Sequence, residues 1–144
     1  MTFKARRVVF GIVALVLLCG GCVAATFGTA VPVRGTVSDI ALDESRGQLY
    51  ISNFTAGRVE VMSTSNYSFG TPLTVAGPPS SVALSPDNRY LVVGEYCNLY
   101  AAPAPVGGYA IFDLQAGTKR EVVLGNPVLA VAFGAGNQAL VRCV

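Results

Sequence analysis

A segment that recurs three times constrains the fold of this chain more than any other feature. The copies begin at Ile40, Val82 and Val131, 42 and 49 residues apart, and they align without gaps over 12 residues. Each copy has a short apolar run, a polar turn and a second run rich in β-forming residues. Asp, Asn, Ser, Pro and Gly dominate the turns, and these residues favour tight reversals of the backbone. Each copy is therefore predicted to form a β-hairpin.

Further β-rich runs follow the first two hairpins. Third strands are predicted at residues 58–62 and 109–113, and outer strands at residues 73–75 and 121–124. Four short strands in every 40 to 50 residues, roughly, is the period of a β-propeller blade. We therefore predict an all-β fold, a partial β-propeller of four-stranded antiparallel blades. The blades are expected at about residues 37–76, 77–125 and 126–144.

The first strand of each copy is continuously apolar, most clearly over residues 128–133. Such a run suits a strand that is buried on both faces. Ala41, Ala83 and Ala132 are equivalent, and each lies between two larger apolar residues, a pattern that fits the taper near the axis of a closed β structure. We expect these strands to be innermost and buried on both faces. A β-sandwich with hairpins that are similar by chance is the alternative, but it gives no reason for the period.

Short motifs within the repeat resemble a known family. Residues 49–53, Leu-Tyr-Ile-Ser-Asn, resemble the signature of the YVTN-repeat β-propellers, and residues 85–88, Ser-Pro-Asp-Asn, resemble their turn between the first two strands. Residues 59–63 and 109–113 are similar to the third strand of that family. The resemblance covers about residues 36–144 and implies the propeller fold. Its relatives include lactonase-like seven-bladed proteins and many exported proteins of unknown role.

The repeat accounts for about two and a half blades, whereas a closed propeller needs about four or more. A partial propeller exposes an apolar blade face and an unpaired strand edge. We therefore expect either further blades in a longer reading frame, the favoured interpretation, or several copies that assemble into a ring. Residues 26–36 are expected to be a linker, in which residues 30–34 could form a closing outer strand.

The N-terminus has the pattern of an export signal. Three cations, at positions 4, 6 and 7, precede an apolar run over residues 8–18, which ends at Cys19-Gly20-Gly21-Cys22. Residues 1–25 are therefore predicted to be a signal peptide or a membrane anchor, helical in the bilayer. Three fates stay open: cleavage near residues 23–25, lipidation of Cys22 as in bacterial lipoproteins, and an uncleaved anchor. Each of them places the remainder outside the cytoplasm, in the periplasm, at the outer surface or at the membrane of a bacterial cell envelope.

Composition argues against a nucleic-acid partner. The net charge of +2 depends on the N-terminal segment, since residues 26–144 carry 7 basic and 8 acidic side chains. Nucleic-acid-binding domains need a clustered basic surface, which this balance does not provide. Only 15 of these 119 residues are charged, which fits strands that pack on both faces.

One loop is a candidate ligand site. Residues 95–108 lie between the predicted second and third strands of the second blade, and they form a longer connection than residues 53–57 of the first blade. Long loops that a rigid scaffold positions often carry binding residues. The candidate ligand contacts are Glu95, Tyr96, Asn98 and Tyr100. A surface insertion without a ligand is the alternative.

Catalytic chemistry has little support in the sequence. There is no His, and the cysteines that remain after signal removal, Cys97 and Cys143, form no CxxC pair, so neither a metal site nor a cofactor is expected. These two cysteines could form a disulfide in an exported protein, or both could be free. Carboxylates in the turns, such as Asp43 and Asp87, are expected to cap or to be solvated.

We therefore expect an exported binding or scaffold module of the β-propeller type, without enzymatic activity. Its expected partners are a membrane, through the N-terminal segment, and further blades or copies of itself. The family resemblance implies an alternative, the N-terminal part of a lactonase-like hydrolase. Because propeller active sites gather residues from several blades, that part is expected to be inactive without the others.

Overall fold

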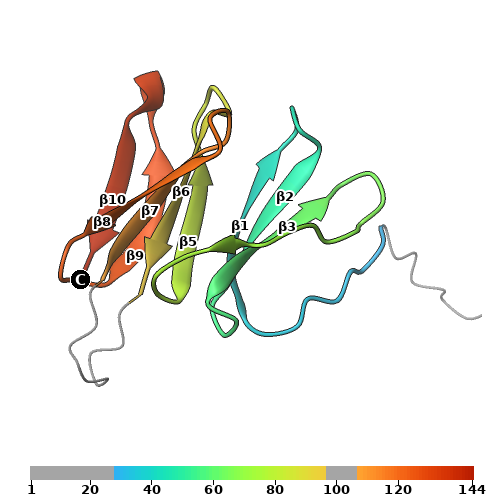
Figure 1. Cartoon of the computed structure of the whole chain (residues 1–144), viewed down its shortest axis with the longest axis horizontal. Helices are drawn as coiled ribbons and strands as arrows, with labels where there is room; N and C mark the ends of the chain where they lie inside the picture. The colour runs from blue at the N-terminus through green and yellow to red at the C-terminus, as the bar shows by residue number, and fades with distance from the viewer. Residues whose placement is uncertain (1–27, 97–106) are drawn as a thin grey trace, which may run out of the picture. The chain divides into compact units, whose positions relative to one another are not determined.

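The computed structural model describes residues 28–96 and 107–144, and Figure 1 shows the chain. Residues 32–144 form one compact unit. Within the described ranges no helix is long and apolar enough to cross a membrane. The predicted signal segment and Cys22 lie outside the described residues, as do Cys97, Asn98 and Tyr100.

Three antiparallel sheets follow one another along the chain, and in each of them consecutive strands are neighbours. The first sheet contains β1 (Val37–Asp43), β2 (Gln48–Asn53), β3 (Arg58–Ser63) and β4 (Leu73–Thr74). The second sheet contains β5 (Pro79–Leu84), β6 (Tyr90–Glu95), β7 (Gly108–Asp113) and β8 (Thr118–Val123). The third sheet contains β9 (Val128–Phe133) and β10 (Ala139–Cys143), joined through the short 3-10 helix η1 (Ala135–Asn137). The all-β prediction with four-stranded antiparallel sheets is confirmed, whereas residues 30–34 form no strand.

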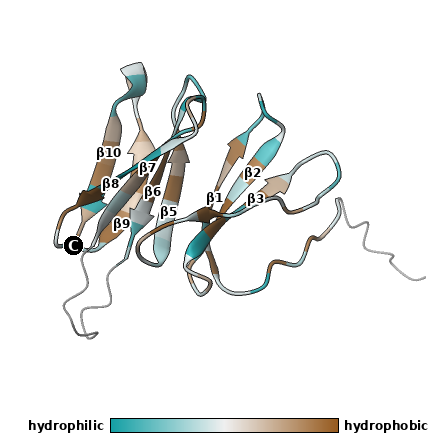
Figure 2. Cartoon of the chain, viewed as in Figure 1, coloured by the Kyte–Doolittle hydropathy of each residue, from teal (hydrophilic) through white to brown (hydrophobic). Residues whose placement is uncertain are grey.

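The hydrophobic core lies between consecutive sheets. One cluster joins Tyr50 and Val59 of the first sheet to Leu91 and Val93 of the second. A second cluster joins the opposite face of the second sheet to β9 and β10, for example Val92 to Val131. Figure 2 shows hydrophobic colour along the strands and mostly hydrophilic colour at the turns. The burial of both faces of the second sheet follows from its position between the other two.

The prediction that every inner strand is buried on both faces is wrong for β1 and β9. Among the inner strands in the described part of the chain, β5 alone has a sheet on each side, and all of its residues are buried or half-buried. In β1 the side chains of Ile40 and Leu42 are 56% and 51% exposed. In β9 three of the six residues, Leu129, Ala130 and Ala132, are exposed. A continuously apolar strand needs a neighbouring sheet on each face, and β1 and β9 each have one within the described residues.

The gapless alignment of the three hairpins is also wrong by one residue in β10. The alignment makes Leu140 equivalent to Leu91 and Ala132 equivalent to Ala83. In the structure, however, Leu140 pairs with Ala132, and the residue that pairs with Ala83 is Val92. Leu140 is therefore the structural equivalent of Val92. The turn of the third hairpin is one residue shorter than the turns of the other two. A shift of one residue moves a side chain to the other face of a sheet. Leu140 accordingly points away from the second sheet and is 72% exposed.

A recurring serine contact joins each inner strand to the next one. The Ser38 hydroxyl donates to the carbonyl oxygen of Pro79 at 2.7 Å, and the equivalent Ser80 hydroxyl donates to that of Val128 at 2.6 Å. Each hydroxyl also lies within hydrogen-bonding distance of a carbonyl oxygen of the second strand in its own sheet. The repeated sequence therefore encodes a repeated contact between sheets.

Candidate functional site

The end of β6 carries two of the predicted ligand contacts, and the structure gives them different environments. Glu95 is only 3% exposed, so its carboxylate is part of the protein interior. Tyr96 is half-buried, and its ring packs against Phe54 at the equivalent end of β2, with 5.9 Å between ring centroids and a tilt of 57°. Ligand binding by these residues stays a prediction, because the rest of the loop lies outside the described residues.

The Glu95 carboxylate lies between β8 and the connection that leads from β4 to β5. Its Oε1 accepts a hydrogen bond from the backbone amide of Ala76 at 3.1 Å, and Glu121 is its hydrogen-bonding neighbour. The ammonium group of Lys119 pairs with Glu121 at 2.8 Å. Burial, together with the negative charge of Glu121, raises the pKa of Glu95 to about 7. Glu95 therefore holds its proton at pH values where an exposed glutamate is ionised.

The first sheet has a different polar cluster at the equivalent place. Asn53, the counterpart of Glu95, is fully buried, and its amide donates to the carbonyl oxygen of Arg34 at 2.6 Å and to Glu60 at 3.3 Å. The guanidinium of Arg58 donates to the same Glu60 oxygen at 2.8 Å. A neutral amide thus replaces the buried carboxylate, and the charges of Glu60 and Arg58 balance each other.

A cavity of about 390 Å³ opens beside this cluster. Glu60 lines it and pairs across the sheet with Ile51, which in turn pairs with Ile40. Residues directly opposite each other in neighbouring strands share a face of the sheet. The cavity therefore lies on the face of the first sheet that points away from the second sheet. Its lining consists of Pro32, Val33, Arg34, Arg58, Glu60, Phe69, Gly70 and Pro72.

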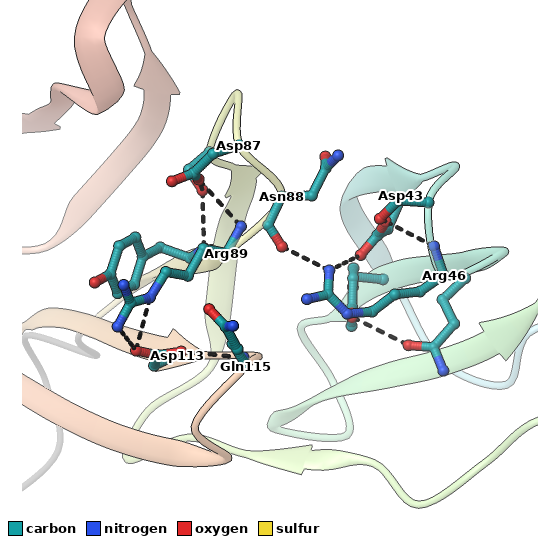
Figure 3. A network of polar contacts seen from close by, with 12 residues as sticks. Asp43, Arg46, Asp87, Asn88, Arg89, Asp113 and Gln115 are labelled. Atoms are coloured by element: carbon teal, nitrogen blue, oxygen red, sulfur yellow. Dashed lines mark hydrogen bonds and ion pairs between the residues drawn. The ribbon is translucent and has the colours of Figure 1, made fainter.

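The turns between the first two strands of the sheets carry a second polar network (Figure 3). The Asp43 carboxylate is fully buried and accepts hydrogen bonds from Ser45 and from the backbone and side chain of Arg46. Burial alone would raise the pKa of Asp43, but these hydrogen bonds hold it below its usual value. The Arg46 guanidinium also donates to the carbonyl oxygen of Asn88 at 2.6 Å, and so it joins the first two turns.

The next turn repeats this connection with other groups. The side-chain amide of Asn137 donates to Asp87 at 2.7 Å, which joins the third turn to the second. Arg89 forms an ion pair with Asp113 at 2.8 Å within the second sheet. Asp43 and Asp87 cap their turns, as expected from the sequence. The sequence analysis missed the contacts between turns, although Arg46, Asn88 and Asn137 occupy the same position of the repeat.

The described residues give little support for a metal site or for a disulfide. Residues 28–96 and 107–144 contain no group of three or more side chains suited to hold a metal ion. Cys143 lies within β10, half-buried, and it has no disulfide partner among these residues. Because Cys97 lies outside them, the pairing of Cys97 with Cys143 stays a prediction.

Comparisons with known proteins identify the fold alone. No family model matches the chain, and no curated protein matches it. Among solved structures it is similar to hydrazine synthase of Kuenenia stuttgartiensis, with a TM-score of 0.61 and 21% identity over 81% of the chain. It is also similar to the β-propeller domain of Cps50 (Swd1) from Myceliophteria thermophila, with a TM-score of 0.63 and 19% identity over 81% of the chain. The chain has the β-propeller fold.

The chain matches only part of each of these structures. It spans about a third of the length of these two structures, 32% and 35%. The first two sheets of this chain are therefore two propeller blades, and the third sheet has the first two strands of another. At these identities the likeness carries no information on activity or ligands.

Proposed function

We propose that this chain is an exported scaffold or binding module of the cell envelope, built from propeller blades. The observation that carries the proposal is the repeated joint between consecutive sheets. Serine contacts at the inner strands and polar contacts between the turns, including that from Arg46 to Asn88, recur in both junctions. Such joints hold neighbouring blades in a fixed relative orientation, which a scaffold requires.

Structural roles explain the polar clusters better than catalytic roles do. Asn53 and Asp43 are fully buried, and each makes several hydrogen bonds to neighbouring groups of the chain. Glu95 has a raised pKa, about 7, but its side chain is closed off from solvent. A general acid or base must reach its substrate, which burial of Glu95 opposes.

The proposed location rests on the N-terminal sequence. Cations at positions 4, 6 and 7 followed by an apolar run are typical of an export signal. The segment would attach the module to a membrane if it stays uncleaved or if Cys22 is lipidated. The module would then face the periplasm or the outer surface of a bacterial cell.

Cell fractionation tests the proposed location, and a hydrolysis assay on the purified protein tests the scaffold role. We expect to find the protein in the envelope fraction of the producing cell. We also expect the purified protein to hydrolyse a panel of lactones no faster than buffer does. Lactone turnover that the Glu95→Gln variant loses would contradict the scaffold proposal and favour the hydrolase alternative. Recovery in the cytosol with an intact N-terminus would contradict the location.

A further inference from the structure

One wall of the cavity beside Glu60 is the segment of residues 32–34, which precedes β1. The side-chain amide of Asn53, fully buried at the end of β2, donates to the carbonyl oxygen of Arg34 at 2.6 Å. Gly35 follows with a φ of 103°, and a Cβ at this position would lie 2.5 Å from Oδ1 of Asn53. Glycine therefore permits the close approach by which Asn53 fixes this wall against the first sheet.

A second wall is the connection between β3 and β4. Phe69 forms a β-bridge with Met62, and the backbone amide of Gly70 donates to the carbonyl oxygen of Val61 at 2.8 Å. These contacts fix the second wall to β3. The two walls contribute the apolar side chains of the lining, which are Pro32, Val33, Phe69 and Pro72. The hydrocarbon part of a ligand can pack on such a surface.

Two arginines and one glutamate give the lining an excess of one positive charge. Arg58 is already matched, because its guanidinium pairs with Glu60 at 2.8 Å. Arg34 is exposed, and it takes part in none of the ion pairs in the described part of the chain. A guanidinium matches a carboxylate in both charge and geometry. The lining therefore favours an anion over a neutral molecule or a cation.

The same charges distinguish the cavity from the joints between sheets. Strand pairing makes Gly108 and Ala110 of the second sheet the counterparts of Arg58 and Glu60. Ala110 is fully buried in the cluster that joins the first two sheets, and neither counterpart is charged. A sheet packed over the cavity would bury the unmatched charge of Arg34, which costs free energy, whereas a small anion would match it.

We propose that this cavity binds a small carboxylate with an apolar body. The carboxylate accepts hydrogen bonds from the guanidinium of Arg34, and the apolar body packs on Phe69 and the prolines of the lining. The volume of about 390 Å³ lies within the range of about 300 to 1,000 Å³ that is typical of small-molecule sites. Such a ligand goes beyond the proposed scaffold role, which needs none.

A ¹H–¹⁵N NMR titration of the full chain with 3-phenylpropionate and with octanoate tests the site. At least one of these carboxylates should cause saturable shifts that centre on the backbone amides of Arg34, Glu60 and Gly70. The neutral analogue 3-phenylpropanamide should bind about tenfold more weakly than 3-phenylpropionate, because it lacks the charge that pairs with Arg34. Added salt should weaken the binding of the carboxylates, since it screens this charge.

Two variants change the charge of the lining in opposite directions. Arg34→Gln should weaken carboxylate binding about tenfold, because it removes the unmatched guanidinium. Glu60→Gln should strengthen it, because it removes the negative charge that competes for Arg58 and keeps an oxygen that accepts hydrogen bonds. The matched control is Arg120→Gln, an exposed arginine of β8 outside the lining, which should bind like the wild type.

Thermal unfolding checks that each variant is folded. The proposal would be overturned if neither carboxylate gave saturable shifts, or if the shifts centred away from the cavity. Equal binding by Arg34→Gln and the wild type, or an equal loss in Arg34→Gln and Arg120→Gln, would also overturn it. The envelope location and the absence of lactone turnover would survive each of these results.

Discussion

Replacing Glu95 by Gln is expected to stabilise the protein by about 3 kcal/mol above pH 7 and to have little effect near pH 4. The side chain is 3% exposed, and its pKa rises from 4.5 to about 7 on folding. The folded state therefore binds a proton that the unfolded state releases between these two values. Each unit of difference corresponds to about 1.4 kcal/mol, so the stability of the wild type falls by about 3 kcal/mol as the pH rises through this window.

The Glu95→Gln variant cannot ionise at this position, and its side chain keeps an oxygen that can accept the hydrogen bond from Ala76. Urea unfolding at a series of pH values measures the difference. The matched control is Glu44→Gln, an exposed glutamate in the first turn, which should follow the wild type at every pH. If Glu95→Gln lost stability with rising pH as steeply as the wild type, the raised pKa of the buried Glu95 carboxyl group would be contradicted.

Truncating Leu91 to Ala is expected to destabilise the protein by about 3 kcal/mol, whereas Leu140→Ala should cost less than about 1 kcal/mol. Leu91 is fully buried in the cluster between the first two sheets, and its removal leaves a cavity there. Leu140 is 72% exposed, so little packing is lost.

This pair of variants tests the register of β10 as well as the core. The gapless sequence alignment makes the two leucines equivalent, and it predicts similar losses of stability. The strand pairing places Leu140 on the opposite face, and it predicts unequal losses. Chemical denaturation measures both values. Equal losses would contradict the observed register.

The strands could be predicted because their signal is local. The repeat predicted the hairpins, and the run over residues 128–133 has the same bounds as β9. Third strands predicted at residues 58–62 and 109–113 match β3 and β7 to within one residue at each end. Alternating apolar residues and turn-forming residues act over short distances, so a single sequence contains them.

Burial and site geometry could not be predicted in the same way, because they depend on neighbouring sheets. Ile40 and Val82 look alike in sequence, yet only Val82 has a sheet packed on its side. Glu95 was predicted as a ligand contact, but it is buried, and its polar neighbours Ala76 and Glu121 lie 19 and 26 residues away in the sequence. The shift in β10 arises from a turn that is one residue shorter, which the gapless alignment conceals.

Amide hydrogen exchange of the dilute protein tests most directly whether the sheets form a row of blades that is open at both ends. The second sheet is covered on both faces, so the amides of β5 and β6 should exchange slowest. The amides of β1 and β10 should exchange faster than those of β5, although each of these three strands pairs with a single neighbouring strand. Exchange in β1 and β10 as slow as in β5 would contradict the open row.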